Sequence, residues 1–249
     1  MNSDNVLKLR ILRRRSHDDP GHWQDILFAV SDEGMTVASA LTVINDSVGT
    51  ENAFKDCNGN PVSAIVWENS CLQKKCGACA MVINGRPCLA CDTKLLPFVG
   101  KTDALTVEPL RKFPVVADLM VDRSRMRENL KNLELWQNGD NTVGDRENED
   151  SYQASLCIQC GCCLDVCPNF EFDGKFFGAA AFVPAAREMI NSSPEDRKEL
   201  RRNYSRHIYS GCGKSLSCKD ICPRGIDTEK LLVRSNAVLL WGKRKSGRS

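Results

Sequence analysis

Fourteen cysteines in a chain of 249 residues constrain this sequence more than any other feature. They fall in two bands, residues 57–91 and 157–222, with no cysteine between the bands. Many stand two residues apart, which suits metal-binding loops better than disulfide bridges, and the N-terminus lacks the apolar core of a secretory signal. The bands therefore predict two domains that each bind metal.

The first band has the spacing of a plant-type [2Fe–2S] site. The cysteines with this spacing are Cys71, Cys76, Cys79 and, after eleven further residues, Cys91. The small residues Gly77 and Ala78 let the backbone wrap closely around a cluster, and its N–H groups can then donate hydrogen bonds to sulfur. A structural zinc site usually takes two C-x2-C pairs, whereas this band has one. Cys88 is a rival for the fourth position, and Cys57 is expected to be a free thiol in a loop.

The second band contains the bacterial ferredoxin run twice. The first copy, C-x2-C-x2-C-x3-C-P, consists of Cys157, Cys160, Cys163 and Cys167 with Pro168. The second copy keeps every spacing but has a serine at one position, and consists of Cys212, Ser215, Cys218 and Cys222 with Pro223. The band is therefore an internal repeat with one substitution.

In two-cluster ferredoxins the fourth cysteine of each run ligates the other cluster. Crossed ligation predicts a complete [4Fe–4S] set made of Cys157, Cys160, Cys163 and Cys222. The second set has only three thiolates, from Cys167, Cys212 and Cys218. An iron at a corner without a thiolate is easily lost, so the serine at position 215 predicts a [3Fe–4S] cluster. The alternative is that the Ser215 hydroxyl holds the fourth iron. Cys162 would break the spacing and is left without a role.

Hydrophobic patterning predicts an α+β chain with two domains, 1–112 and 113–249. The first domain is expected to be a small mixed sheet clasping one helix. Its predicted strands cover residues 6–15, 25–30, 80–83, 87–91 and 105–110, and its helix begins after the N-cap residue Thr36. Residues 45–63 are expected to form a surface loop.

The second domain is predicted to be mainly α-helical. Apolar residues recur at helical spacing over 115–133, and the polar, acidic segment 138–150 is interpreted as an exposed loop. Further helices are expected over 179–191 and 195–206, and from 228 to 240 after the N-cap residue Asp227.

Charge and hydropathy exclude some partners. A net charge of +2 gives no reason to expect nucleic acid. The longest mostly apolar stretch, Phe176 to Ala186, is shorter than the roughly 20 residues that cross a bilayer. We therefore expect a cytoplasmic chain without a membrane segment of its own.

Taken together, the motifs resemble the iron–sulfur subunits of succinate dehydrogenase and fumarate reductase over nearly the whole chain. The resemblance rests on Ser70-Cys71, Cys76-Gly77-Ala78-Cys79, Asn84-Gly85-Arg86-Pro87, Leu89-Ala90-Cys91, Cys157-Ile158-Gln159-Cys160-Gly161, Cys167-Pro168, Cys212, Cys218 and Cys222-Pro223. It implies a β-grasp [2Fe–2S] domain followed by a helical domain with two clusters, and it selects Cys91 over Cys88 as the fourth [2Fe–2S] ligand.

The resemblance also implies partners. Electrons would run from a covalent flavin in an FAD-bearing flavoprotein subunit through the [2Fe–2S], [4Fe–4S] and [3Fe–4S] clusters to a quinone at a cytochrome b-type membrane anchor. The flavoprotein would carry out the succinate and fumarate chemistry, so no catalytic residue is expected here. The chain would lie at the cytoplasmic face of the cell membrane, held there by the anchor.

Two positions depart from the ubiquinone-reducing members of that family. This chain has Phe172 where they carry a tryptophan, and Gly213 where they carry a histidine. The tryptophan and the histidine help to bind quinone in those relatives, so their absence from this chain favours menaquinone and a haem-bearing anchor.

Two other functions are compatible with parts of the pattern. A subunit of another flavin-linked complex, one that oxidises a hydroxy acid or a thiol, would share the helical two-cluster half. A zinc-stabilised interaction protein would use the same cysteines without sulfide.

Overall fold

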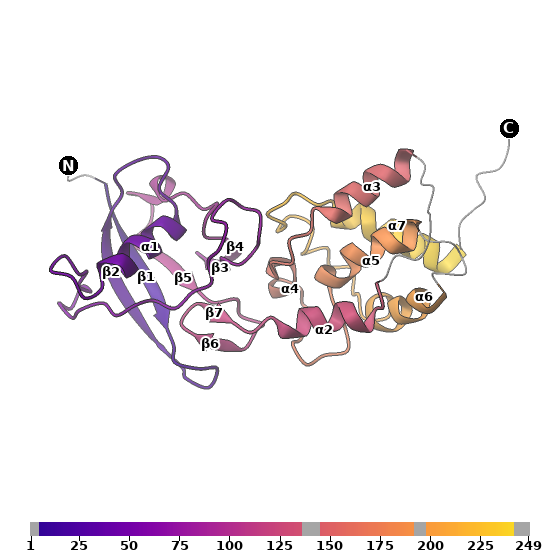
Figure 1. The fold of residues 1–249 in the computed structure, drawn as a ribbon, viewed down its shortest axis with the longest axis horizontal. Helices are drawn as coiled ribbons and strands as arrows, with labels where there is room; N and C mark the ends of the chain where they lie inside the picture. Colours follow the sequence, from indigo (N-terminus) through magenta and orange to yellow (C-terminus); the bar gives the residue numbers. More distant parts are fainter. Residues whose placement is uncertain (1–4, 136–144, 192–197, 242–249) are drawn as a thin grey trace. The chain divides into compact units, whose positions relative to one another are not determined.

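The computed structural model describes residues 5–135, 145–191 and 198–241 and divides the chain into two units. The first unit ends at Asp122 and the second begins at Arg123. The first is built on a β-sheet and the second on α-helices (Figure 1). The predicted α+β class is confirmed.

The first unit contains a five-stranded mixed sheet in the order β2-β1-β5-β3-β4. The strands are β1 (Val6–Arg13), β2 (His22–Ala29), β3 (Ala80–Ile83), β4 (Arg86–Leu89) and β5 (Leu105–Glu108). β1 pairs antiparallel with β2 and parallel with β5, while β3 pairs antiparallel with both β5 and β4. This is the mixed sheet that the sequence predicts.

Local sequence explains the sheet. Every second side chain of β1 is buried, including Leu7, Leu9 and Ile11, so one face of the strand belongs to the core. Asn84 and Gly85 have φ angles of 47° and 75°. Two consecutive left-handed residues make the short turn that joins an antiparallel hairpin, here between β3 and β4.

The α-helix of this unit's described part, α1 (Val37–Ser47), begins as predicted. The Thr36 hydroxyl accepts a hydrogen bond from the Ser39 N–H at 3.2 Å, and the Ser39 hydroxyl accepts one from the Thr36 N–H at 2.7 Å. This reciprocal capping box satisfies two N–H groups at the start of the helix. The helix buries its apolar face, formed by Val37, Ala38, Ala40, Leu41 and Ile44.

Residues 113–122 differ from the prediction. The prediction of a helix over 115–133 is wrong for the first part of this range. There, Val115–Ala117 (β6) and Met120–Val121 (β7) form a two-stranded antiparallel sheet. Only Ser124–Asn132 (α2) is helical. Asp118, between the two strands, accepts hydrogen bonds from Arg13 at the end of β1, which places 113–122 in the first unit. The sequence predicts the domain boundary at residue 112, and that boundary stays a prediction.

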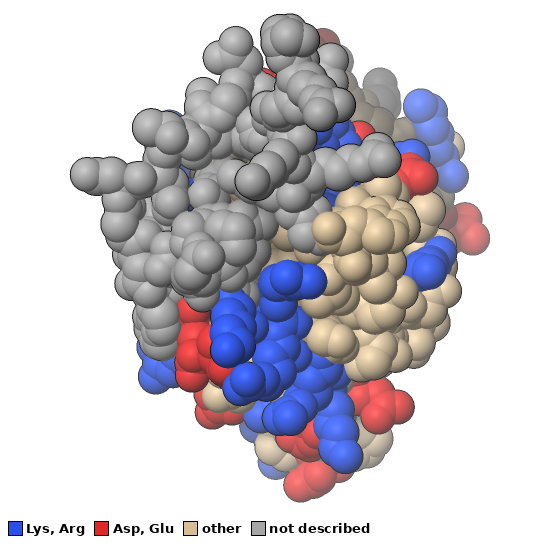
Figure 2. Space-filling model, turned by 90° about the vertical axis from the view of Figure 1, so that its right-hand side faces the viewer, with Lys and Arg blue, Asp and Glu red and all other residues tan. Residues whose placement is uncertain are grey.

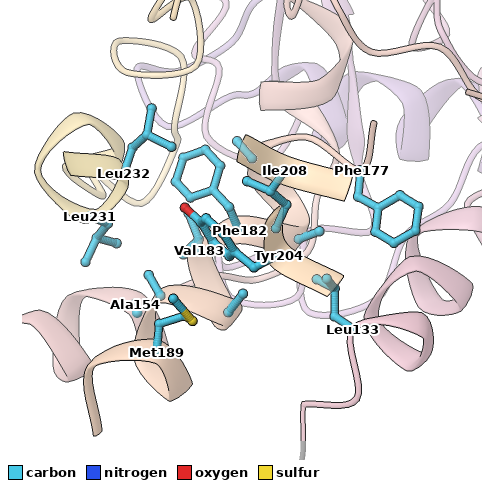
Figure 3. Packing of buried hydrophobic residues seen from close by; sticks show 14 of the residues in the cluster. Leu133, Ala154, Phe177, Phe182, Val183, Met189, Tyr204, Ile208, Leu231 and Leu232 are labelled. Atoms are coloured by element: carbon cyan, nitrogen blue, oxygen red, sulfur yellow. The ribbon is translucent and has the colours of Figure 1, made fainter. Parts of the chain in front are cut away.

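The second unit is organised around α5 (Ala179–Asn191), which packs against five other helices. They are α2, α3 (Asp145–Ser155), α4 (Cys162–Asp165), α6 (Lys198–Tyr204) and α7 (Thr228–Trp241). In the core, Phe182 and Met189 of α5 lie near Tyr204 of α6 and Leu231 of α7 (Figure 3). The Tyr204 hydroxyl donates to the Asn236 side chain at 3.1 Å, which satisfies its polar end.

The expected loop over 138–150 is wrong for the residues described. Residues 138–144 lie outside the described part, whereas 145–150 belong to α3. Asp150 is fully buried and forms ion pairs with Lys230, at 2.9 Å, and with Arg234, both on α7. This buried contact between distant segments explains why an acidic stretch is helical here.

The later helices follow the prediction more closely. α5 and α7 begin where expected, and the Asp227 carboxylate accepts a hydrogen bond from the Lys230 N–H at 3.0 Å as an N-cap does. The helix predicted over 195–206 has its first residues, 195–197, outside the described part. α6 ends at Tyr204 and continues as a π-helical turn, Ser205–Tyr209.

The surface of the second unit carries both charged and apolar regions. Lys and Arg side chains gather beside an uncharged area on the face seen in Figure 2. Helix α7 exposes Val233, Leu240 and Trp241. Within the described residues, no helix has the length and apolar character needed to cross a membrane.

Candidate iron–sulfur sites

The loop from Cys71 to Cys79 carries backbone N–H groups that face cysteine sulfurs. Three of its residues, Leu72, Lys74 and Gly77, have φ angles of 51°, 58° and 77°. Left-handed residues in such close succession make the chain turn tightly. As a result the N–H groups of Gln73 and Lys75 lie 3.3 and 3.4 Å from Cys71 Sγ, and that of Lys74 lies 3.3 Å from Cys91 Sγ.

The β3–β4 hairpin brings the remaining cysteines of this group together. Cys79 directly precedes β3, and Cys91 stands two residues after β4. The Ala90 N–H donates to the Cys79 carbonyl at 3.0 Å, and the side chains of Cys79 and Cys91 are hydrogen-bonded. Cys71 is hydrogen-bonded to Cys76, and the negative charge of a Cys76 thiolate helps to raise the pKa of Cys79. The four predicted ligands thus stand in one group.

The two ends of this group differ in electrostatics. The pKa of Cys71 is lowered to about 7, chiefly by the Gln73 N–H, with further help from the Cys76 thiol and the Lys75 N–H. The pKa of Cys79 is raised to about 12, chiefly by burial. Hydrogen-bond donors around Cys71 favour the thiolate, which is the form that binds metal. A positive iron centre would supply the same stabilisation to the buried Cys79.

Cys88 and Cys57 have other surroundings. Cys88 lies within β4, where its Sγ atom is 3.3 Å from the Thr93 hydroxyl, and burial raises its pKa. Cys57 is exposed, and its N–H donates to the Asp25 carbonyl at 2.8 Å. Within the described residues, neither forms a hydrogen bond with Cys71, Cys76, Cys79 or Cys91.

In the second unit, one pocket, called here the first pocket, is lined by four thiols. They belong to Cys157, Cys160, Cys163 and Cys222. The first three come from one segment, and Cys222 comes from the loop before α7. Ala179, Ala180 and Val183 of α5 form an apolar wall.

A second pocket is lined by three thiols and one hydroxyl. They belong to Cys167, Cys212, Cys218 and Ser215. Asn169, Phe176 and Gly213 also line it. Each pocket therefore takes cysteines from both runs, in the same grouping that crossed ligation predicts from the spacing.

Short local structures hold these cysteines. Gly161, with a φ angle of 89°, starts the single turn of α4, which carries Cys163. The Cys212 N–H donates to the Ile208 carbonyl at 3.0 Å, at the end of the π-helical turn. His207 of that turn stacks on Phe177, with ring centroids 4.1 Å apart. Lys214 and Leu216, on either side of Ser215, both have a φ angle of 57°, so the loop bends sharply there.

Burial raises the pKa of Cys157, Cys163 and Cys218 in these pockets. It raises the pKa of Cys163 well above its usual value, and neighbouring thiols add to the effect. By contrast, the pKa of Cys160 is lowered to about 7, chiefly because the Cys162 thiol donates a hydrogen bond to it. Cys162 itself is fully buried. Cys162 therefore has a described contact with a predicted ligand, which spacing alone did not suggest.

The residues present fit iron–sulfur clusters. Thiolates are soft ligands that bind such clusters, and here they line buried, mostly apolar pockets or a loop rich in N–H donors. Among the described residues, no three His, Cys, Asp or Glu side chains gather closely enough to hold a single metal ion.

Two polar residues near the sulfurs have no role that the sequence predicts. The Gln159 amide nitrogen lies 3.1 Å from Cys157 Sγ, and the Thr228 hydroxyl lies 3.6 Å from Cys218 Sγ. Gln159 occupies a position inside the C-x2-C spacing, which is the one signal that could have pointed to it. Thr228 stands ten residues from its cysteine, and nothing in the spacing marks it.

Two known families of iron–sulfur domains match two successive segments of the chain. Residues 8–128 match the family described as a 2Fe-2S iron-sulfur cluster binding domain, and residues 153–226 match the 4Fe-4S dicluster domain. In fold, the chain is similar to a chain of the Mycobacterium smegmatis Sdh1 complex in the apo form, with a TM-score of 0.73 and 25% identity over 95% of this chain and 96% of that one.

Relatives in sequence cover most of the chain. The succinate dehydrogenase iron–sulfur subunit of Bacillus subtilis is 33% identical over 198 residues, which are 75% of this chain and 76% of that protein. The fumarate reductase iron–sulfur subunit of Escherichia coli O6:H1 is 28% identical over 231 residues, 89% of this chain and 88% of that protein. Together with the cysteine groups of the two units, this similarity shows that the chain belongs to the family of succinate dehydrogenase and fumarate reductase iron–sulfur subunits.

Proposed function

We propose that this chain is the electron-transfer subunit of a membrane-bound succinate:quinone oxidoreductase. It relays electrons between the flavin of an FAD-bearing flavoprotein subunit and a quinone at a cytochrome b-type membrane-anchor subunit. Succinate and fumarate are interconverted on the flavoprotein, so no residue of this chain is assigned to that chemistry. The names of its relatives support this assignment.

Eleven cysteines hold three clusters in this proposal. Cys71, Cys76, Cys79 and Cys91 hold [2Fe–2S]; Cys157, Cys160, Cys163 and Cys222 hold [4Fe–4S]; Cys167, Cys212 and Cys218 hold [3Fe–4S]. Ser215 stands where a fourth ligand of the last cluster would be, and oxygen is a harder and weaker ligand for that iron than sulfur. Cys57, Cys88 and Cys162 are not ligands.

The observation that carries the proposal is the exchange of cysteines between the two runs. Cys222 lines the first pocket with three cysteines of the first run, and Cys167 lines the second pocket with two cysteines of the second run. This exchange is the arrangement of two-cluster ferredoxins. It is not expected of independent zinc knuckles, each of which would use its own C-x2-C pair.

The protein's own groups tune the clusters. When bound, the clusters accept and release one electron at a time. The N–H groups of Gln73, Lys74 and Lys75 donate to cysteine sulfurs and so stabilise the negative charge that reduction adds. Apolar walls from α5 keep water away from the first pocket.

A groove beside the second pocket supports contact with a membrane anchor. It is lined by Val233, Leu240 and Trp241 of α7, which are exposed, and it shares Leu216 and Leu232 with the second pocket. Exposed apolar side chains in one groove are typical of a protein interface. The proposed occupant is the anchor subunit, which would hold the chain at the cytoplasmic face of the cell membrane.

Menaquinone is the proposed electron acceptor. Gly213 lines the second pocket, and a Cβ atom built on it would lie 2.8 Å from the Asn169 side-chain oxygen. A histidine at position 213, as in ubiquinone-reducing relatives, would require Asn169 to move. Phe172 replaces the tryptophan of those relatives as well.

Purification of the complex from membranes tests this function. We expect a flavoprotein and a haem-containing anchor to co-purify, and the oxidised sample to give the EPR signal of a [3Fe–4S] cluster. Succinate should reduce the clusters, and a menaquinone analogue should reoxidise them faster than a ubiquinone analogue. A colourless protein with zinc and no acid-labile sulfide would refute the proposal, as would reduction by a hydroxy acid or a thiol in place of succinate.

A further inference from the structure

The side chain of Gln159 joins a predicted cluster ligand to helix α5. Its amide nitrogen lies 3.1 Å from Cys157 Sγ and 2.8 Å from the Ala180 carbonyl oxygen. A carbonyl oxygen can only accept, so the nitrogen of the amide must be the end that faces both partners. Its two N–H bonds are therefore shared between one sulfur and one backbone oxygen.

Gln159 directs a second donor at the same sulfur. Its backbone N–H also donates to the Cys157 side chain, so two N–H groups of one residue face a single Sγ atom. Cys157 is partly buried, and burial raises its pKa more than these donors lower it. In such surroundings a hydrogen bond to a charged sulfur has a larger effect than in water.

Gln159 adopts this arrangement at a conformational cost. Its φ angle of 52° is in the left-handed region that residues other than glycine rarely adopt. Its side-chain oxygen is buried and accepts no hydrogen bond among the described residues. Both features destabilise the folded chain, and residues held at such a cost cluster at functional sites. An apolar residue of similar size would avoid the buried, unpaired oxygen.

We propose that Gln159 is a positioning residue that raises the reduction potential of the cluster held by Cys157, Cys160, Cys163 and Cys222. The inference rests on the function proposed above. Reduction adds negative charge to the cluster and its ligands, so N–H donors to Cys157 Sγ stabilise the reduced form more than the oxidised form. The bond to Ala180 fixes the amide so that it keeps facing the sulfur.

Two variants of the purified complex separate this role from a structural one. Gln159→Leu removes the side-chain donor, and Gln159→Glu keeps the size but replaces the donor with a carboxylate. The readout is the midpoint potential of the [4Fe–4S] cluster, from EPR spectra of samples poised at a series of potentials. In Gln159→Leu we expect the oxidised-to-reduced ratio at a fixed potential to rise about tenfold, which equals a shift of about 59 mV to lower potential for one electron. Gln159→Glu should lower the midpoint potential further, because it places a negative charge beside the sulfur.

The control is the same substitution at Gln153 on α3. Among the described residues, the Gln153 amide donates only to the exposed Glu149 carboxylate, at 3.0 Å, so Gln153→Leu should leave all three potentials unchanged. The [2Fe–2S] potential serves as an internal control in every sample. Wild-type potential in both Gln159 variants would overturn the inference, and so would loss of the cluster from both, because Gln159 would then be only structural. Absence of any [4Fe–4S] signal from the wild-type protein would instead refute the proposed function.

Discussion

Gly178 lies directly against the side chain of Leu164. A Cβ atom built on Gly178 would be 2.3 Å from Leu164 Cδ2, and the glycine has a φ angle of 71°. Leu164 is fully buried on α4, between Cys163 and Cys167, which line different pockets. The residue before α5 and the segment that carries Cys163 and Cys167 are therefore in direct contact.

We expect Gly178→Ala to destabilise the second unit by about 2–5 kcal/mol. Overpacking against Leu164 and a left-handed alanine both contribute to this cost. The measurement is the free energy of unfolding in urea, together with iron bound per chain. Gly225→Ala is the matched control. Its φ angle is 67°, but apart from the chain neighbours no atom of the described residues lies within 4 Å of the added Cβ, so only the backbone cost of about 1–2 kcal/mol remains. Equal losses in the two variants would contradict the steric role of Leu164.

Replacing Ser215 with cysteine should complete the ligand set of the second pocket. Ser215 lines this pocket with Cys167, Cys212 and Cys218, so a thiolate there could bind a fourth iron. We expect the oxidised-state EPR signal of [3Fe–4S] to disappear, the potential of this cluster to fall and quinone reduction to slow. An unchanged oxidised spectrum in Ser215→Cys would contradict the crossed ligation.

Cys91 and Cys88 offer a test of the first site. The Lys74 N–H faces Cys91 Sγ at 3.3 Å, whereas Cys88 Sγ is near the Thr93 hydroxyl, also at 3.3 Å. We therefore expect Cys91→Ser to lose or strongly alter the EPR signal of reduced [2Fe–2S], while Cys88→Ser retains it. The opposite outcome would make Cys88 the ligand and remove Cys91 from the proposed set.

The features that the sequence predicts well are local ones. The capping box at Thr36 and the Asn84-Gly85 turn involve residues within a few positions of each other, so their side chains alone indicate the structure. The cysteine runs are local as well, and the only long-range step, the exchange of Cys167 and Cys222, followed from the known pattern of paired runs. The grouping of cysteines in the pockets agrees with it.

The features that the sequence mispredicts depend on distant contacts. Val115 and Leu119 fit a helical spacing, yet they lie in a hairpin region because Asp118 is bound to Arg13, 105 residues away. The acidic segment before Asp150 is helical because that carboxylate is buried against α7. No local pattern reports such pairings, because each partner on its own is typical of an exposed residue.

The last prediction concerns Asp118. Its carboxylate accepts hydrogen bonds from the Arg13 guanidinium at 3.0 and 3.1 Å, from the Arg14 N–H at 3.1 Å and from the Val66 N–H at 2.9 Å. It therefore joins β1, the chain at Val66 and the β6–β7 turn, and both Arg13 and Asp118 have side chains only 9% exposed. Breaking such a buried pair leaves the arginine charge without compensation, which costs about 3–5 kcal/mol.

Asp118→Asn tests this, because asparagine tolerates the φ angle of 43°, while the negative charge and one of the two acceptor oxygens are replaced by a neutral amide. We expect the free energy of unfolding of the first unit to fall by about 3–5 kcal/mol. The measurement is unfolding in urea, monitored by the visible circular dichroism of the [2Fe–2S] cluster. The control is Asp25→Asn, which weakens the ion pair between Asp25 and Arg10. The side chain of Asp25 is 23% exposed and that of Arg10 is 43% exposed, so the loss of stability should stay below about 1 kcal/mol. A loss from Asp118→Asn as small as that of the control would show that the hairpin belongs to the first unit for reasons other than this carboxylate.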